Sequence, residues 1–134
     1  MENRYLFRAK RTDTGEWVIG YLSYPHCMKK GNESYYFYAK DSLGFYCRCV
    51  VAASTICRCT GLRDKNGKLI WENDIVNCLT EDCCGYIGWN ESEAGFYFNA
   101  LLEDGRFEEE HIYDYQDCIE VIGNTFDSPE LLEV

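Results

Sequence analysis

The chain has 134 residues, of which 46% are hydrophobic and 16% aromatic, and its formal net charge is −10 at pH 7. This length suffices for one core or two small ones, and so aromatic a composition with only two prolines excludes an intrinsically disordered chain. The sequence shows no signal-peptide pattern and no apolar run near the roughly 20 residues of a membrane span, so we expect a soluble cytoplasmic protein.

The N-terminal region predicts β structure. Residues 4–9 and 16–22 alternate between polar and apolar side chains on either side of a Thr14-Gly15 turn. Because side chains along a strand point alternately to its two faces, this pattern predicts an antiparallel hairpin. No window of a dozen residues has the 3.6-residue period of an amphipathic helix, and we expect a mainly β fold.

Two further strands are expected after a polar loop at residues 29–34. Residues 35–39 (Tyr-Tyr-Phe-Tyr-Ala) and residues 45–51 have the aromatic and β-branched composition of strands, and the turn-forming residues 41–44 separate them. Consecutive rings in residues 35–38, and again in residues 96–98, place aromatic side chains on both faces of their strands. One face is then expected in the core and the other at an interface.

A tight hairpin turn is predicted at residues 64–68 (Asp-Lys-Asn-Gly-Lys). Gly67 supplies the positive φ that completes a type I turn with a G1 bulge. That register pairs Leu62 with Ile70 and puts both on one face. The alternative two-residue turn would set two lysines directly opposite each other, so we prefer the bulged form.

The C-terminal segment predicts a bend followed by a short helix. Gly123 and Asn124 bend the chain after a strand at residues 119–122, and Ser128 before Pro129 is typical of an N-cap followed by proline at the first helical position. Only about six residues remain for this helix, too few for stability in isolation. We therefore expect its two leucines to dock on the rest of the fold or on a neighbouring subunit.

Three blocks of this sequence, together with its opening Arg4 and Phe7-Arg8-Ala9, resemble the YopX family of small phage and prophage proteins. The blocks are Thr-Gly-Leu-Arg-Asp-Lys-Asn-Gly-Lys at 60–68, Trp-Glu-Asn-Asp-Ile-Val at 71–76 and Glu-Val-Ile-Gly-Asn-Thr-Phe-Asp-Ser-Pro-Glu-Leu-Leu at 120–132. The resemblance implies a mostly β, self-associating protein of temperate phages with an SH3-like barrel and no established activity. It brings no catalytic residues.

From this resemblance we expect an SH3-like barrel with a C-terminal helical turn at residues 55–134, and an N-terminal β region at residues 1–54 packed on it as one compact unit. Where the family usually has Gly before Asp74, this chain has Asn73, which tolerates the left-handed region better than other non-glycine residues. The residues expected to set turns are Gly61, Asp64, Gly67, Asp74, Gly123, Asn124 and Pro129.

Charge is distributed unevenly along the chain. Residues 1–71 hold twelve Lys and Arg against six Asp and Glu, whereas residues 72–134 hold one against seventeen. The acidic half repels phosphate, so its partner is expected to be basic or a cation. Three interpretations of the carboxylates at 103–104 and 108–110 remain open. They lie in solvated turns, they contact the basic half of another subunit, or they imitate nucleic acid and bind a basic host protein.

Nine cysteines require a choice between metal binding, disulfides and packing. A hairpin centred on Ala53 would put Cys49 opposite Cys57 and Cys47 opposite Cys59, and four thiols on one face can ligate zinc. Against this, residues 50–56 contain no Gly or Pro to reverse the chain, and the spacing is not the usual C-x2-C knuckle. We favour reduced thiols that pack as small apolar side chains.

Catalytic motifs are missing from the sequence, and only His26 and His111 offer imidazole bases, so we expect neither enzymatic activity nor a cofactor. His111 is expected on an exposed strand edge. The favoured function is that of a phage accessory protein acting by protein–protein contact, as a homo-oligomer.

Binding of single-stranded nucleic acid is the alternative function. Bases would stack on rings of the N-terminal half, where Arg4, Arg8, Lys10 and Arg11 cluster. The overall charge of −10 disfavours this alternative, and nucleic acid is not an expected partner.

Overall fold

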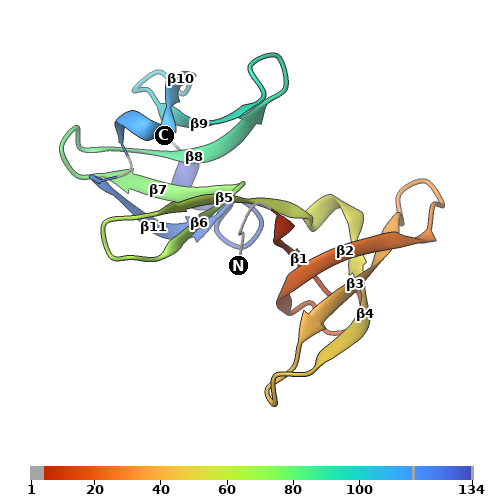
Figure 1. The fold of residues 1–134 in the computed structure, drawn as a ribbon. Coiled ribbons are helices and arrows are strands. Elements are labelled where there is room, and N and C mark those ends of the chain that lie inside the picture. Colours follow the sequence, from red (N-terminus) through yellow and green to blue (C-terminus); the bar gives the residue numbers. More distant parts are fainter. Residues whose placement is uncertain (1–4, 116, 134) are drawn as a thin grey trace. The chain divides into compact units, whose positions relative to one another are not determined.

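The computed structural model describes residues 5–115 and 117–133, and it is built mainly of antiparallel strands (Figure 1). The chain forms two compact units, residues 1–59 and 60–134, whereas the sequence placed the boundary after residue 54. The first unit extends further because the first residues of β5 (Cys57–Arg63) pair with β1 (Phe7–Lys10). In the described part of the chain, no helix is long and apolar enough to cross a membrane.

The first unit is an antiparallel sheet with the strand order β4-β3-β2-β1-β5. Besides β1 and the start of β5, it contains β2 (Trp17–Cys27), β3 (Ser34–Lys40), β4 (Tyr46–Ala52) and the 3-10 turn η2 (Ala53–Thr55). The N-terminal hairpin, the loop after it and the two following strands are thus confirmed. The second strand is longer than predicted, because two register irregularities around Pro25 let it continue to Cys27.

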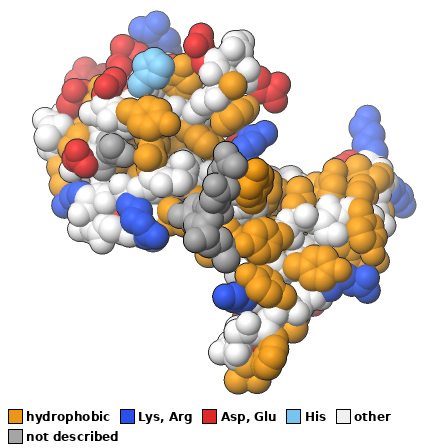
Figure 2. Space-filling model, viewed as in Figure 1, with side chains coloured by type: hydrophobic (Ala, Val, Ile, Leu, Met, Phe, Trp, Pro, Cys, Tyr) orange, Lys and Arg blue, Asp and Glu red, His pale blue; other side chains and the backbone are white. Residues whose placement is uncertain are grey.

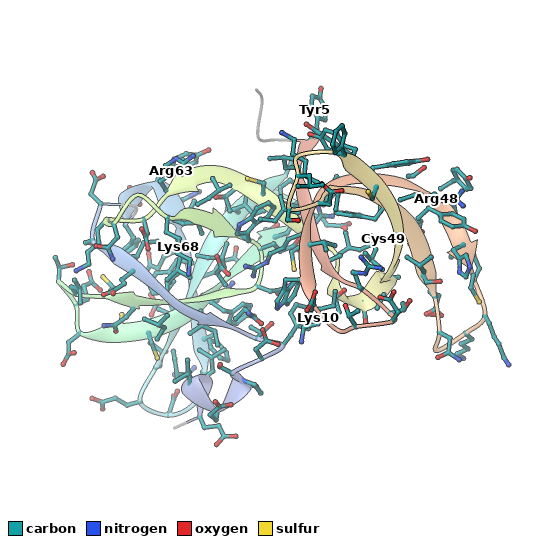
Figure 3. All side chains as sticks on the ribbon, turned by 90° about the horizontal axis from the view of Figure 1, so that it is seen from below. Tyr5, Lys10, Arg48, Cys49, Arg63 and Lys68 are labelled. Atoms are coloured by element: carbon teal, nitrogen blue, oxygen red, sulfur yellow. The ribbon has the colours of Figure 1, made fainter. Side chains whose placement is uncertain are left out.

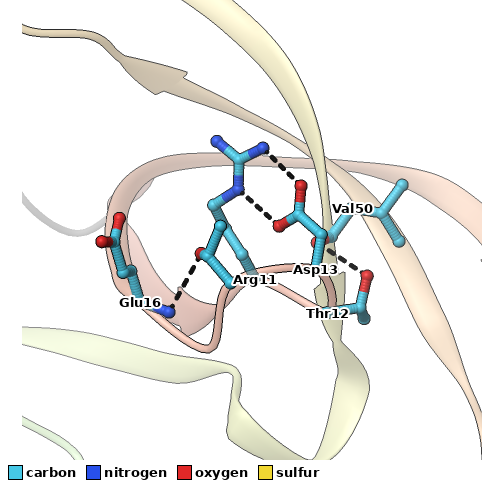
Figure 4. Close-up of polar contacts among 6 residues, drawn as sticks. Arg11, Thr12, Asp13, Glu16 and Val50 are labelled. Atoms are coloured by element: carbon cyan, nitrogen blue, oxygen red, sulfur yellow. Dashed lines mark hydrogen bonds and ion pairs between the residues drawn. The ribbon is translucent and has the colours of Figure 1, made fainter.

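The core of the first unit lies on one face of this sheet, which curls back on itself at one end. The buried core residues are Ala9, Phe37, Ala39, Cys49 and Val51. Arg11, just after β1, forms a β-bridge with Val51 of β4, and the Thr12 N–H donates to the Val50 carbonyl at 3.0 Å. The Thr12 hydroxyl donates to the same carbonyl at 3.4 Å (Figure 4). This closure covers the core from the end of β1.

The second unit contains the rest of β5 and six further strands. They are β6 (Leu69–Trp71), β7 (Asp74–Cys78), β8 (Cys83–Asn90), β9 (Gly95–Leu101), β10 (Phe107–His111) and β11 (Ile119–Asn124), with the 3-10 turns η3 (Ile112–Asp114) and η4 (Pro129–Leu132). Strand β5 lies beside β6, and a five-stranded sheet has the order β10-β9-β8-β7-β11. Its core residues are Ile70, Val76, Cys78, Ile87, Phe98, Ala100, Ile112 and Ile119.

The closed barrel expected in this unit does not form among the described residues. The five-stranded sheet is open, with β10 and β11 at its edges. Each inner strand pairs with the next along the chain, and β11 returns to pair with β7. The prediction of a mainly β fold is confirmed, but the described strands of this unit form an open five-stranded sheet in place of the expected closed barrel.

The predicted hairpin turn between β5 and β6 forms with its bulge. The Gly67 N–H donates to the Asp64 carbonyl at 3.0 Å, the Asp64 N–H donates to the Lys68 carbonyl at 2.8 Å, and Gly67 has φ 82°. Leu62 packs against the same core that contains Ile70, as the bulged register predicts. Arg63 and Lys68 flank the turn (Figure 3).

The chain bends after β11 as expected. The pairing of β11 with β7 shifts register between Val121 and Gly123, and Asn124 Oδ1 then accepts hydrogen bonds from the two backbone N–H groups of residues 126 and 127. Ser128 occupies the N-cap of η4 with Pro129 next to it, but its side chain makes no capping hydrogen bond. The helix is a four-residue 3-10 turn. A Cβ at Gly123 would lie 3.2 Å from Leu131 Cδ1, so this leucine docks directly over the glycine.

Candidate functional site

One face of the first unit combines aromatic and basic side chains. Strands β1 to β4 contain four basic residues and no Asp or Glu. Directly paired residues of an antiparallel sheet share a face, and the observed register puts all four basic residues opposite the core side. We call the following set the aromatic–cationic face: Arg8, Lys10, Trp17, Ile19, Tyr21, Tyr36, Tyr38, Lys40, Tyr46 and Arg48.

The cations of this face stack on its rings. The Arg8 guanidinium carbon lies 4.9 Å and Lys10 Nζ 5.3 Å from the centre of the Trp17 ring. A second stack puts the Arg48 guanidinium carbon 4.5 Å from the Tyr36 ring centre. Such cation–π contacts contribute about 0.5–1 kcal/mol each at exposed sites. They hold the long basic side chains flat over the sheet.

The aromatic–cationic face spans all four strands, from Lys10 on β1 to Arg48 on β4 (Figure 3), and half of its ten residues are exposed while the other half are partly buried. Ile19 is 52% exposed, Tyr46 46% and Tyr38 38%. An open hollow of about 420 Å³ is lined by residues that include Trp17, Ile19, Lys40 and Tyr46. Exposed large apolar side chains in one contiguous patch are typical of an interaction surface.

Sequence reasoning located part of this face. It named Arg8 and Lys10, and it predicted the rings of β3, of which Tyr36 and Tyr38 point outward. Arg11 belonged to the predicted basic cluster, but its guanidinium instead forms two hydrogen bonds with the Asp13 carboxylate, at 2.9 and 2.8 Å (Figure 4). Arg4 lies outside the described residues.

Lys40 and Arg48 escaped the sequence reasoning, although the signal was present. Each is the direct neighbour of a buried residue in its strand, Ala39 in β3 and Cys49 in β4. Because neighbouring side chains of a strand point to opposite faces, the two-residue period would have placed both cations on the outer face.

The four candidate zinc thiols do not come together. The required hairpin is not formed, because β4 pairs with β3 and β5 pairs with β1. Cys49 and Cys57 are buried, and the Cys57 thiol donates to the Thr55 carbonyl at 3.3 Å. Cys59 is buried and Cys47 exposed. Among the described residues, no group of three or more His, Cys, Asp or Glu side chains is arranged to hold a metal ion.

A different thiol group lies at the junction of β7, β8 and β11. The Sγ atoms of Cys78 and Cys118 are 3.6 Å apart, and the two cysteines do not form a disulfide. Cys83 pairs with Cys78 across the β7–β8 ladder, and burial, with smaller contributions from nearby charges, raises the pKa of its thiol to about 11. The group packs against the core of the second unit. Sequence reasoning missed it because the pairing of β11 with β7 brings together residues 40 positions apart.

The residues predicted to set turns lie in several kinds of backbone. Gly61 lies inside strand β5 and not in a turn, with φ 78°, and Asn73 has φ 70°, the left-handed conformation predicted for it. Asp74 is buried, and its Oδ2 accepts a hydrogen bond from the Trp71 N–H at 2.8 Å. Gly67 lies in the turn between β5 and β6, Gly123 and Asn124 are the last residues of β11, where its pairing with β7 shifts register, and Pro129 begins η4.

Asp64 has the most demanding environment of these residues. Burial raises the pKa of its carboxyl, but hydrogen bonds from the N–H groups of Val121, Lys68 and Asn66 outweigh this effect, and the net pKa lies below the ordinary value. The carboxylate is therefore ionised at neutral pH while it is only 6% exposed. Its chemistry is that of an acceptor for backbone groups.

The two histidines lie in different surroundings. His26 Nδ1 is 3.1 Å from Ser34 Oγ, and its ring packs edge-on against Tyr36 at 4.9 Å between centres. A hydroxyl–imidazole pair supplies two members of a nucleophile–base–carboxylate triad, but the neighbouring carboxylate of Glu33 accepts from the Gly31 N–H. His111 ends the edge strand β10, as predicted, and stacks near Tyr97 at 4.8 Å.

The acidic residues concentrate in the second unit. Residues 60–134 contain eighteen Asp and Glu against four Lys and Arg, whereas residues 1–59 contain five against nine. In the view of Figure 2, acidic side chains gather near β9 and β10, and hydrophobic side chains cover much of the visible surface of the first unit. Glu108, Glu109 and Glu110, expected in a turn, belong to strand β10.

The chain is similar to a protein family and to solved structures. The family model described as YopX protein matches residues 6–133. Among solved structures, the chain is similar to protein EF1440 from Enterococcus faecalis, with 24% sequence identity, a TM-score of 0.41, and coverage of 95% of this chain and 96% of that one. A search of curated proteins finds no match.

Proposed function

The chain belongs to the YopX protein family, and we propose that it is a non-catalytic binding protein whose aromatic–cationic face docks onto the acidic unit of a second copy. The observation that supports this proposal is the charge contrast. The four strands that build the face carry only basic charges, while the second unit has a net charge of −14. Opposite potentials steer association and favour one register of contact.

The rings supply the apolar part of the contact. Tyrosine, tryptophan and arginine dominate the energetics of protein interfaces because they bury large areas and keep a polar end. The face offers Trp17, Tyr38, Tyr46 and Arg48 together, and Ile19 stands between them. A partner carboxylate can pair with a guanidinium that already lies on a ring, so little side-chain entropy is lost on binding.

Sedimentation equilibrium of two double variants tests this proposal. Lys40→Glu with Arg48→Glu reverses two charges on the face, and Lys29→Glu with Lys30→Glu makes the same net change in the exposed loop after β2. We expect self-association of the wild type at about 50 mM salt that weakens at about 500 mM. The face variant should associate at least about tenfold more weakly, and the loop variant should resemble the wild type.

Two results would contradict the proposal. One is a wild-type protein that stays monomeric at low salt over the whole concentration range. The other is an equal loss in both variants, since that outcome would make net charge alone responsible. Circular dichroism of each variant confirms that the strands are retained.

Single-stranded nucleic acid is the second candidate ligand of the same face. The interleaving of rings with four cations on one side of an antiparallel sheet favours it, because bases stack on rings while cations neutralise phosphates. Anisotropy of a labelled oligothymidine, measured with the same two double variants, separates this candidate from self-association. Binding that falls with salt and is lost only in the face variant would favour nucleic acid.

An acidic surface that imitates nucleic acid is a third use, and it concerns the second unit. The carboxylates of β10 support it, and a basic host protein captured by the chain would be its ligand.

The wider setting, a phage accessory protein in the cytoplasm of the bacterial host, is our inference from the family resemblance. We also propose that strands β7 to β11 are SH3-like in their topology. Strands β7 to β10 form a meander, the 3-10 turn η3 follows, and β11 returns to pair with β7.

A further inference from the structure

Three cysteines of the second unit lie together, although they come from separate segments of the chain. Cys78 ends β7, Cys83 begins β8, and Cys118 directly precedes β11. Strand β7 lies between β8 and β11 in the sheet, so Cys78 has the central position in this group (Figure 1). The aromatic–cationic face lies in the first unit, so a role of these thiols is independent of the function proposed for that face.

Backbone hydrogen bonds hold Cys78 and Cys118 side by side. Cys78 pairs with Ile119, the residue after Cys118, and the Leu79 N–H donates to the Cys118 carbonyl at 3.1 Å. The two Sγ atoms are 3.6 Å apart, whereas a disulfide has an S–S distance of about 2.0 Å. Rotation of the two side chains can close this gap while the strands stay paired.

The two sulfurs differ in exposure. Cys78 is fully buried, whereas Cys118 is only partly buried, so a dissolved oxidant reaches Cys118 first. The Cys118 thiol donates to the Tyr115 carbonyl at 3.2 Å, and burial raises its pKa. Because the thiolate is the reactive form, the raised pKa slows the oxidation of Cys118 without preventing it.

The surroundings of Cys78 favour its thiolate. Its Sγ lies 3.4 Å from Thr80 Oγ1. Burial raises the pKa of this thiol, but hydrogen bonds, of which those from the Thr80 hydroxyl and the Glu81 N–H are the strongest, outweigh this effect, and the net pKa lies below the ordinary value. A thiolate is the form that attacks an oxidised sulfur. Cys78 is therefore suited to react with Cys118 once Cys118 is oxidised.

The third thiol of the group is the less suitable partner. Cys83 lies directly opposite Cys78 across the β7–β8 ladder. Burial, with smaller contributions from nearby charges, raises the pKa of Cys83 to about 11. Almost all Cys83 side chains are then protonated at neutral pH, and we expect this thiol to stay reduced.

We propose that Cys78 and Cys118 form an oxidation site, at which hydrogen peroxide converts the two thiols into a disulfide. The Cys118 sulfur attacks one peroxide oxygen, the O–O bond breaks, the thiol proton leaves with the other oxygen as water, and a sulfenic acid remains. The Cys78 sulfur then attacks the Cys118 sulfur. The S–S bond forms, the S–O bond breaks, and the hydroxide leaves as water with the Cys78 proton. The two sulfurs give two electrons to the peroxide, and two waters form.

The disulfide stabilises the second unit. It joins the end of β7 to the segment before β11 and closes a loop of 40 positions. Such a cross-link lowers the conformational entropy of the unfolded chain. Strand β11 also supplies the Val121 N–H that donates to Asp64 Oδ2 at 2.9 Å, so fixing β11 on β7 supports this contact as well. Oxidation thus makes the second unit more resistant to unfolding.

Peptide mapping of the full chain tests the pairing. The protein is treated with a small excess of hydrogen peroxide, alkylated, and digested without reduction by a protease that cleaves after glutamate. This cleavage separates Cys78 (residues 73–81), Cys83 (82–91) and Cys118 (111–120), whereas trypsin leaves the first two together because residues 69–105 contain no Lys or Arg. We expect residues 73–81 linked to residues 111–120, and dithiothreitol should separate them. A link from Cys78 to Cys83, or no disulfide at Cys78, would overturn the proposal.

Single substitutions identify the two sulfurs. Cys78→Ser and Cys118→Ser should each abolish the disulfide, and Cys83→Ser is the matched control that should retain it. In Cys78→Ser the sulfenic acid of Cys118 has no partner, so dimedone, which labels sulfenic acids, should mark Cys118. Dimedone labelling of Cys78 in Cys118→Ser, with no labelling of Cys118 in Cys78→Ser, would overturn the proposed order of steps. Circular dichroism verifies that each variant keeps its strands.

Thermal unfolding measures the effect on stability. Peroxide should raise the melting temperature of the wild type and of Cys83→Ser by at least about 5 °C, and dithiothreitol should reverse the rise. Cys118→Ser should show no rise. An equal rise in Cys118→Ser, or an unchanged melting temperature in wild-type protein whose disulfide has formed, would overturn the stabilising role.

Discussion

Two hairpin turns, at residues 41–45 in the first unit and 64–68 in the second, are built in the same way. In each, the glycine N–H donates to the carbonyl of the aspartate three residues earlier, and the glycine has a positive φ of 87° at Gly44 and 82° at Gly67. Each aspartate Oδ1 accepts hydrogen bonds from the N–H groups two and four positions later, at 2.9–3.0 Å. Locally, the turns are interchangeable.

Their surroundings differ. Asp41 is exposed at the end of the β3–β4 hairpin. Asp64 is buried, its second oxygen accepts from the Val121 N–H of β11 at 2.9 Å, and the Lys65 N–H donates to the Ile119 carbonyl at 3.1 Å. The same five-residue motif only reverses the chain in one unit, whereas in the other it also binds a distant strand. The difference arises from what packs against the turn.

The largest expected effect is that of Asp64→Ala. Three backbone N–H groups lose their acceptor, of which that of Val121 belongs to another strand, and we expect a loss of about 3 kcal/mol in the free energy of unfolding of the second unit. Urea denaturation followed by resonances of each unit measures it. Asp41→Ala is the control and should cost much less. Equal losses would remove the distinction between the two turns.

Lowering the pH should reduce the stability that the ionised Asp64 contributes to the second unit. The pKa of Asp64 lies below its ordinary value in the folded chain, so its stabilisation is complete above an unfolded pKa of about 4 and is lost as the pH falls through the lower folded pKa. Thermal unfolding at a series of pH values from neutral to strongly acidic follows this. The stability of Asp64→Asn should depend less steeply on pH in the acid range than that of the wild type, and an identical dependence would be inconsistent with the proposed role.

Glycine substitutions should show where the two turns are alike. Gly44→Ala and Gly67→Ala introduce a Cβ that meets no atom within 4 Å, so only the positive φ is penalised. We expect both to cost about 1–2 kcal/mol. Differential scanning calorimetry of the pair measures the shift. A far larger loss for Gly67→Ala would mean that its backbone, and not only the aspartate, is part of the anchor.

The smallest effect concerns the ion pair beside the anchor. Lys65 Nζ lies 3.7 Å from Glu120 Oε2, and both side chains are about one-third exposed. Solvent screening reduces such a pair to roughly 0.3 kcal/mol, so Lys65→Ala should hardly change the denaturation midpoint. A double-mutant cycle with Glu120→Ala provides the measurement, and a coupling above about 1 kcal/mol would contradict this assessment.

Local chemistry made much of the fold predictable from the sequence. The Asp64 turn, its bulge and the left-handed Asn73 depend on neighbouring residues alone, and all three appear as predicted. The strand at residues 7–10 followed from alternation and the strand at residues 34–40 from its aromatic composition. The two-residue period of a strand then accounts for the outward rings Tyr36 and Tyr38.

Contacts between distant segments were out of reach. The pairing of β5 with β1 decides where the first unit ends and separates the cysteines that a local hairpin would have gathered. The Val121 bond to Asp64 spans 57 positions. No local pattern encodes such pairings, since the same alternating strand fits several neighbours equally well.

The three successive glutamates of β10 have a consequence that needs no ligand. Strand β10 is at the margin of its sheet, where backbone donors and acceptors face outward and can recruit a strand from another molecule. Repulsion between identical rows of carboxylates blocks that recruitment, and so protects the protein from aggregation through this margin. Part of the negative charge of the chain therefore opposes the pairing of β10 strands between two molecules.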